Sequence, residues 1–197
     1  MSTERELFDL HARPERRDAA RNRELLLEAA HRLVEHRGVP AVTMDAVAAE
    51  AGVGKGTVFR RYGSRAGLMT ALLDDGEARW QAQVISGPPP LGPGAPPLER
   101  LLAFGASRLD QTLRNADLMV AAAGTHGRSL PAVAFWTAHV RHLLAELRVT
   151  GDLPLLATAL LAPLEVTIVL PQLEAGVERE RILATWADVV ERVVRAG

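Results

Sequence analysis

The chain has 197 residues, and its 23 lysines and arginines nearly balance its 24 aspartates and glutamates, which leaves a formal net charge of −1. Apolar residues make up 48% of the sequence and charged residues 24%, a balance typical of globular proteins and not of disordered chains. Cysteine is absent, which excludes disulfide scaffolds, thiolate metal sites and cysteine nucleophiles.

Targeting and membrane signals are also weak. The segment Met1–Arg21 is charged throughout and has no apolar centre, so we expect no signal peptide. The longest apolar run, Leu153–Leu173, is interrupted by Pro154, Pro163 and Glu165, and we therefore do not interpret it as a membrane span. These features predict a cytoplasmic protein with no membrane partner.

The first part of the chain predicts a series of helices. Residues 1–17 are interpreted as a flexible basic arm, either a solvated tail or a segment that follows DNA. Asp18 can cap a helix that runs to about Arg37, since its apolar residues fall on one stripe and Gly38 suits the position after a helix. Thr43 is the expected N-cap of a second, short helix that ends at Gly52.

A third helix is expected to begin near Lys55 and to end at Tyr62-Gly63, and Ser64 is expected to cap a fourth helix that runs to about Val84. Two short helices joined by the turn Ala51–Gly54, with a longer helix before them, have the sequence form of a helix-turn-helix. Gly52 suits this turn because a residue without a side chain adopts a positive φ at little cost.

The segment Thr43–Arg65 resembles the DNA-binding module of the TetR/AcrR family of bacterial transcriptional regulators, and the helix that ends at Gly38 resembles the first helix of that family. The resemblance covers about residues 22–70. Phe59 stands where the family commonly has a tyrosine, and Gly54 stands where it commonly has a serine cap. Competing interpretations of Gly52–Thr57 are a phosphate-binding loop, whose Walker spacing it lacks, and a purely structural helical hairpin.

The resemblance implies a set of DNA-contacting residues. Thr43 and Arg65 are expected to hold phosphates at helix N-termini, and Tyr62 to touch the DNA backbone or to brace the turn. The third helix is expected to face the major groove. The full predicted DNA-binding set is Thr43, Lys55, Gly56, Thr57, Arg60, Arg61, Tyr62 and Arg65.

The second half of the chain predicts further helices after a linker rich in proline and glycine, Ser86–Pro97. One amphipathic helix starts at Leu98, a short one spans Asp117–Ala123, and Pro131 suits the first turn of another. Asp152 can cap a very apolar helix that is bent at Pro163. The last helix is expected from about Glu178 to Arg195.

These helices predict a domain for effector binding and dimerisation. The two apolar C-terminal helices either close their own domain or supply half of a four-helix interface between two subunits, and the resemblance implies the dimer. The expected interface residues are Leu160, Leu164, Ile182, Trp186, Val189 and Val193. The expected ligand-binding residues are Phe104, Phe135, Trp136 and His139, with His126 as a further polar point and plain core as the alternative for the two phenylalanines.

The sequence therefore predicts an all-α protein with a flexible arm (1–17), a helix-turn-helix DNA-binding domain (18–66) and a helical effector-binding and dimerisation domain (67–197). The expected function is that of a sequence-specific transcriptional regulator, a repressor that binds a palindromic operator as a homodimer and is released by a small-molecule effector. We expect no enzyme activity, no cofactor and no metal, although His139 and His142 have a spacing that can share a metal ion. The alternative is a helical binding protein or enzyme with a vestigial helix-turn-helix.

Overall fold

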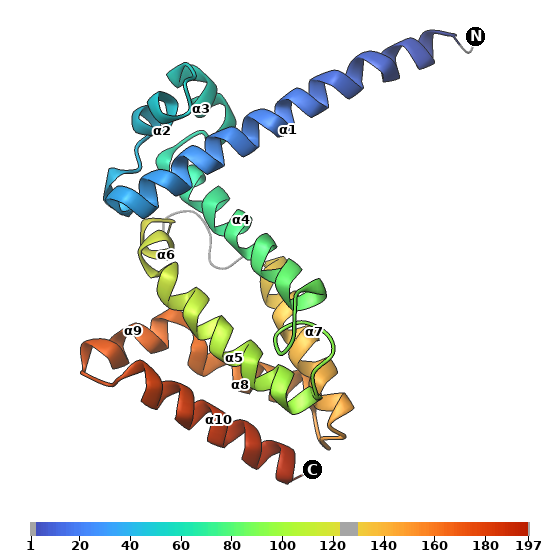
Figure 1. Ribbon diagram of the computed structural model, residues 1–197, viewed down its shortest axis with the longest axis vertical. Helices are drawn as coiled ribbons and strands as arrows, with labels where there is room; N and C mark the ends of the chain where they lie inside the picture. Colours follow the sequence, from blue (N-terminus) through green and yellow to red (C-terminus); the bar gives the residue numbers. More distant parts are fainter. Residues whose placement is uncertain (1–2, 123–129, 197) are drawn as a thin grey trace. The chain divides into compact units, whose positions relative to one another are not determined.

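The computed structural model describes residues 3–122 and 130–196, and over these residues it contains helices and no strand (Figure 1). The expectation of an all-α fold is therefore confirmed. The chain divides into an N-terminal unit, residues 1–75 with 121–125, and a C-terminal unit, residues 76–120 with 126–197. The division at Asp75 falls inside a helix, whereas the sequence placed the domain boundary after residue 66.

The N-terminal unit contains α1 (Thr3–Arg37), the short 3-10 helix η1 (Val39–Ala41), α2 (Met44–Glu50), α3 (Lys55–Tyr62) and the first part of α4 (Arg65–Ser86). In Figure 1, α2 and α3 lie beside the C-terminal half of α1, and the N-terminal half of α1 extends away from them. The predicted boundaries of α2 and α3 agree with the structure. The first helix begins at Thr3, earlier than the predicted start at Asp18, so the expected arm is helical from that residue onward.

Local chemistry explains the tight geometry of α2 and α3. Thr43 Oγ1 accepts a hydrogen bond of 3.0 Å from the backbone N–H of Ala46, which satisfies one of the free donors at the start of α2. Gly52 adopts φ +67°, the left-handed conformation that the sequence predicted for the turn between the two helices. The core below them is apolar and fully buried, with Leu26, Val47, Val58 and Leu68 each at most 1% exposed.

The C-terminal unit contains the rest of α4 and six further α-helices with one 3-10 turn among the described residues. They are α5 (Pro97–Arg114), α6 (Ala116–Ala122, whose last two residues group with the N-terminal unit), α7 (Leu130–Glu146), α8 (Leu153–Leu161), η2 (Ala162–Leu164), α9 (Val166–Glu174) and α10 (Arg179–Arg195). Asp152 caps α8 through a hydrogen bond of 3.1 Å from the Leu155 N–H, as the sequence predicted.

Trp186 of α10 fixes the packing of this unit. Its indole Nε1 donates a hydrogen bond of 2.7 Å to the carbonyl of Leu160, and its ring lies directly over Gly105 of α5. A Cβ atom at Gly105 would meet the ring at 2.0 Å, so only glycine permits α5 and α10 to approach this closely.

The segment Leu153–Glu174 is long and apolar enough by composition to cross a bilayer, with a mean hydropathy of 2.0. In the structure it is divided into α8, η2 and α9, with Pro163 inside the 3-10 turn. Each of the two α-helices is 9 residues long, whereas a spanning helix needs roughly 20. The proline therefore breaks the run at the position where the sequence predicted a bend.

Candidate nucleic-acid interface

The exposed face of α3 carries the cationic residues that the sequence singled out. Lys55, Gly56, Arg60 and Arg61 are exposed and Thr57 is half-buried, whereas Val58 on the opposite face is fully buried. Neither Arg60 nor Arg61 has an ion-pair partner within the described part of the chain. Their guanidinium groups are therefore available to an external anion, and each presents five N–H donors.

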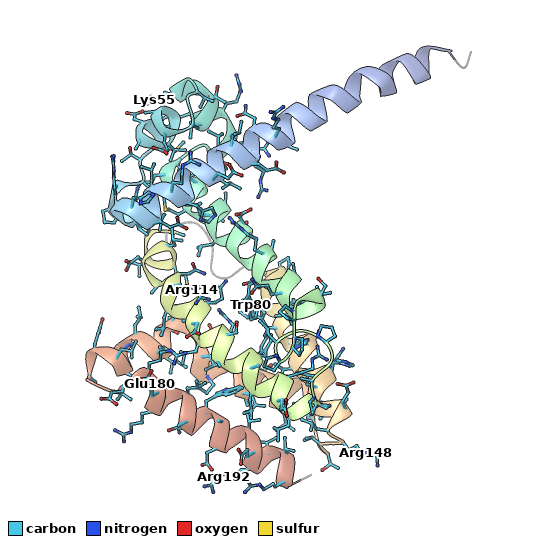
Figure 2. The ribbon with its side chains drawn as sticks, in the orientation of Figure 1. Lys55, Trp80, Arg114, Arg148, Glu180 and Arg192 are labelled. Carbon is cyan, nitrogen blue, oxygen red and sulfur yellow. The ribbon has the colours of Figure 1, made fainter. Side chains whose placement is uncertain are left out.

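Lys55 is the exception on this face because it is already paired. Its Nζ lies 2.7 Å from Oδ1 and 2.8 Å from Oδ2 of Asp45, at the first turn of α2, and 5.6 Å from the centre of the Phe59 ring. Figure 2 shows Lys55 at the start of α3, beside α2. Since both charged groups are largely exposed, the pair is weak and screened by salt, and Lys55 can exchange Asp45 for a phosphate.

A groove of about 200 Å³ lies between α1 and α3 in the N-terminal unit. Thr57, Arg60 and Arg61 line it from α3, and Asn22 and Arg23 line it from α1. Sequence reasoning did not include Asn22 and Arg23 in the site. Their position could have indicated this role, since they come just before the apolar stripe of the first helix. Residues at that position lie beside the third helix when the helices pack together.

Arg65, predicted as a phosphate ligand, has internal hydrogen-bond partners in the structure. Its Nε and Nη2 donate hydrogen bonds of 2.8 Å each to the backbone carbonyls of Val42 and Val39, so the guanidinium holds the start of α4 to the segment around η1. The side chain is half-buried. Arg65 is therefore part of the internal structure of the module, because two of its five N–H donors bind backbone carbonyl groups.

Tyr62 lies at the end of α3. Its hydroxyl oxygen is buried and has no hydrogen-bond partner among the described residues. Burial raises the pKa of Tyr62, against the opposing influence of Arg23 and Arg61. Thr43, whose Oγ1 caps α2, remains exposed beside the first N–H groups of that helix.

Two further polar contacts hold the unit together. His31 Nε2 of α1 lies 3.0 Å from Oδ2 of Asp75 at the end of the unit's portion of α4. Arg32 Nε of α1 donates a hydrogen bond of 2.9 Å to Oε1 of Glu50 on α2. Because α1 is tied to both α2 and α4, the cationic face of α3 is carried by a rigid support.

The four predicted ligand-binding residues lie close together in the C-terminal unit. Phe104 is fully buried, and its ring centre lies 4.9 Å from that of His139 and 5.1 Å from that of Trp80. Phe135 stacks on His139 at 6.1 Å. Trp136 is 4% exposed, and its Nε1 donates a hydrogen bond of 2.6 Å to Glu77. His126, the further polar point, lies outside the described residues.

His139 is enclosed by these rings. Burial lowers its pKa to about 4, and the charges of Arg100 and His142 act in the same direction. Its Nε2 is buried and has no partner among the described residues. His142 lies 3.7 Å from Glu146 and is largely exposed, so the two histidines differ in environment. No group of three metal-ligating side chains occurs in the ranges 3–122 and 130–196.

Arg108 of α5 joins this cluster, although sequence reasoning did not find it. It is 2% exposed, and its Cζ lies 3.8 Å from the centre of the Trp136 ring. Burial lowers its pKa to about 10, partly offset by the carboxylate of Glu77, so it remains a cation at neutral pH. A helical pattern marks position 108 only as facing inward, and the contact with Trp136 depends on the packing of α5 against α7.

Most of the predicted dimer-interface residues lie in the core of their own unit. Leu160, Leu164, Ile182 and Trp186 are at most 8% exposed, because η2 and α10 pack on α5 and α8 packs on α7 and α10. Leu160, Ile182 and Trp186 also line an open groove of this unit. Val193 is half-buried and Val189 is 44% exposed. The large apolar residues exposed on the described C-terminal helices α8 to α10 are Leu155, Ile168 and Val189.

Comparison with known proteins agrees with this geometry. Residues 26–72 match the family model described as bacterial regulatory proteins, tetR family. A relative named HTH-type transcriptional regulator, from Staphylococcus aureus strain USA300, is 38% identical over 53 residues, and proteins of the same description from other strains of that species match equally well. The match spans 27% of this chain and 29% of the relative, so the chain covers less than a third of the length of that relative.

Two solved structures resemble nearly the whole fold. A TetR-family transcriptional regulator from Pectobacterium atrosepticum superposes with a TM-score of 0.70 at 19% identity, over 92% of this chain and 96% of that one. The reduced form of Escherichia coli NemR has a TM-score of 0.56 at 18% identity, over 87% and 96% of the two chains. At these identities the likeness establishes the fold alone.

The molecule is thus a helix-turn-helix module followed by an all-helical unit. Residues 26–72 are the part of the chain that matches the tetR family model of bacterial regulatory proteins.

Proposed function

We propose that the protein is a cytoplasmic transcriptional regulator that binds a palindromic DNA operator as a homodimer and acts as a repressor released by a small-molecule effector, and that it is not an enzyme. The observation that carries DNA binding is the exposed cationic face of α3, formed by Arg60, Arg61 and Lys55 in a helix-turn-helix. A helix of this kind lies in the major groove, where its side chains reach base edges and phosphates.

The groove between α1 and α3 adds to this proposal. Arg23 and Asn22 of α1 lie on the same groove as Arg60 and Arg61, so a phosphate that enters it meets donors from two helices. Phosphate contacts fix the register of a protein on the duplex, while the residues of α3 select the sequence. In this proposal Thr43 supplies a further phosphate contact at the start of α2, and Arg65 holds the module together.

Dimerisation supplies the second recognition helix that a palindrome requires, about 34 Å or a multiple of it away along the duplex. The proposed partner is a second copy of this chain on the α8–α10 face, where Leu155, Ile168 and Val189 are exposed. This face also has an open groove of about 300 Å³ with an apolar lining that includes Val177 and Val189. Exposed apolar side chains beside an open groove are typical of a surface that another protein covers.

Effector release requires that the ligand bind the DNA-free conformation better than the DNA-bound one, and DNA then weakens ligand binding by the same factor. The helix α4 belongs to both units, with Arg65 in the first and Glu77 in the second. It is therefore one covalent connection through which a change beside Glu77 acts on the module. The proposed effector contacts are the cluster of Phe104, Phe135, Trp136 and His139.

The test is binding to the DNA upstream of the protein's own gene, measured over a series of salt concentrations. The double variant Arg60→Glu/Arg61→Glu should abolish specific binding. The matched control is Arg114→Glu/Arg141→Glu, which reverses two exposed charges in the C-terminal unit and should bind normally. Each lost phosphate contact lowers the slope of log K against log salt by about 0.9. Unchanged binding by the Arg60/Arg61 variant would refute the proposal.

A further inference from the structure

Arg108 is a buried cation without a matching acceptor. It has no hydrogen bond among the described residues, and its Nη2 is a buried donor with no partner there. One face of the guanidinium is covered by the Trp136 ring at 3.8 Å. Stacking on an aromatic ring leaves the in-plane N–H groups of a guanidinium free. These are the donors that form bidentate hydrogen bonds with a carboxylate.

Glu77 compensates for this charge only partly. It acts on Arg108 through space, but its Oε1 already accepts hydrogen bonds from Trp136 Nε1 at 2.6 Å and Gln81 Nε2 at 2.8 Å. Burial of a cation without hydrogen-bond acceptors is costly, and natural proteins rarely retain such a group unless another molecule completes it. The Arg108 guanidinium therefore has a buried N–H donor without an acceptor, next to the Trp136 ring.

Two more buried nitrogen atoms without a partner in residues 3–122 and 130–196 lie in the same region. They are Nε of Arg100 and Nε2 of His139. Arg100, Phe104 and Arg108 follow one another at four-residue intervals, so they form one stripe along α5, with about 6 Å of helix rise between successive members. The Phe104 ring, which contacts His139, thus has a polar hydrogen-bonding group on each side.

We propose that Arg108 is the anchor for an effector of the carboxylate class, a small organic acid whose planar oxyanion takes the free edge of the guanidinium and whose apolar body packs against Phe104 and Phe135. This inference deepens the ligand-responsive part of the proposed function and rests on it. His139, with Arg100, provides the second polar contact for the far end of the molecule.

A purely structural role for Arg108 predicts different behaviour. If the guanidinium only balances Glu77, its replacement by a flexible apolar residue changes stability without changing the choice of ligand, since buried ion pairs are often replaceable by apolar side chains. If Arg108 is an anchor, Arg108→Met loses the preference for acids over their neutral analogues. The Arg108→Lys variant retains the charge but not the planar donor edge, so it should show an intermediate preference.

The experiment compares acid and amide pairs on the full-length protein in the absence of DNA. The probes are 4-phenylbutyrate, indole-3-acetate, octanoate and decanoate, each against its primary amide, with calorimetry and thermal shift as readouts. At least one acid should bind about 10-fold more tightly than its amide, as expected for a charge-assisted hydrogen-bonded pair. Arg108→Met should remove this preference, whereas the control Arg114→Met, on the same helix but exposed, should retain it (Figure 2).

The wild-type protein also provides a test that needs no variant. The sequence has three tryptophans, whose indole N–H signals are distinguishable by NMR. A bound acid should move the signal of Trp136 more than that of Trp186, whose N–H is bonded to Leu160. The proposal is overturned if no acid is preferred to its amide, if the preference survives in Arg108→Met, or if Trp136 does not respond. Acid binding in a protein that ignores DNA would refute the proposed function instead.

Discussion

Arg65 provides a sharp test of how the helix-turn-helix is built. Its replacement by methionine removes two hydrogen bonds of 2.8 Å, to Val42 and Val39, and keeps a side chain of similar length. A hydrogen bond from a charged donor contributes about 1.5–3 kcal/mol when buried. The site is half-buried, and Val39 still accepts from the Val42 N–H at 3.1 Å, so we expect a total loss of about 2–4 kcal/mol.

The matched comparison is Arg60→Met, which removes the same charge from an exposed position with no internal hydrogen bond among the described residues. It should change stability by less than about 0.5 kcal/mol while weakening DNA binding. Urea unfolding followed by circular dichroism gives the stability, and titration of operator DNA at a concentration of urea where both variants are folded gives the affinity. An Arg65→Met protein as stable as Arg60→Met but unable to bind DNA would show that Arg65 is a phosphate ligand after all.

Three more predictions follow from the C-terminal unit. Gly105→Ala should destabilise the protein by about 1–2 kcal/mol in urea unfolding, because overpacking against the Trp186 ring outweighs a gain of about 1 kcal/mol in helix propensity. The control is Gly76→Ala, whose Cβ meets nothing within 4 Å and which should stabilise the protein by up to about 1 kcal/mol. Because the pKa of His139 is about 4 in the folded protein, against an ordinary value of 6.5 for the unfolded chain, its contribution to stability is present above about pH 6.5 and is lost as the pH falls from 6.5 to 4. Unfolding of His139→Gln should therefore be less sensitive to pH in that range by about 1 kcal/mol, after a discount for the solvent that reaches the ring, and an unchanged profile would contradict this assignment. Glu77→Gln keeps an acceptor for Trp136 but removes a like charge from the proposed anion site, so calorimetry should detect tighter acid binding, and weaker binding would count against that site.

The sequence predicted most of the fold because its helices carry their own boundary signals. Thr43 and Asp152 cap the helices that they were expected to cap, and Gly52 has the expected positive φ. The start of α1 was missed because the charged segment before Asp18 has no apolar stripe, and periodicity was the main signal used there.

The exposed face of α3 was also predictable, since helical spacing separates Val58 from Arg60 and Arg61. The role of Arg65 was not, because its acceptors are carbonyl groups that face it only after η1 has formed. The contact of Arg108 was not predictable for the same reason. Its partner Trp136 is on another helix, and nothing in the local pattern distinguishes a buried arginine that stacks on an indole from one that covers the surface with its aliphatic stem.

The pairing of Lys55 with Asp45 has a consequence for how a regulator finds its target in a genome. Every phosphate that Lys55 meets must compete with a carboxylate that is already within 3 Å, whatever the base sequence. In the proposed function, this competition lowers the affinity of the protein for arbitrary DNA and shortens the time that it spends on each incorrect stretch before it slides or dissociates. Discrimination between the operator and other DNA is then left to Arg60 and Arg61.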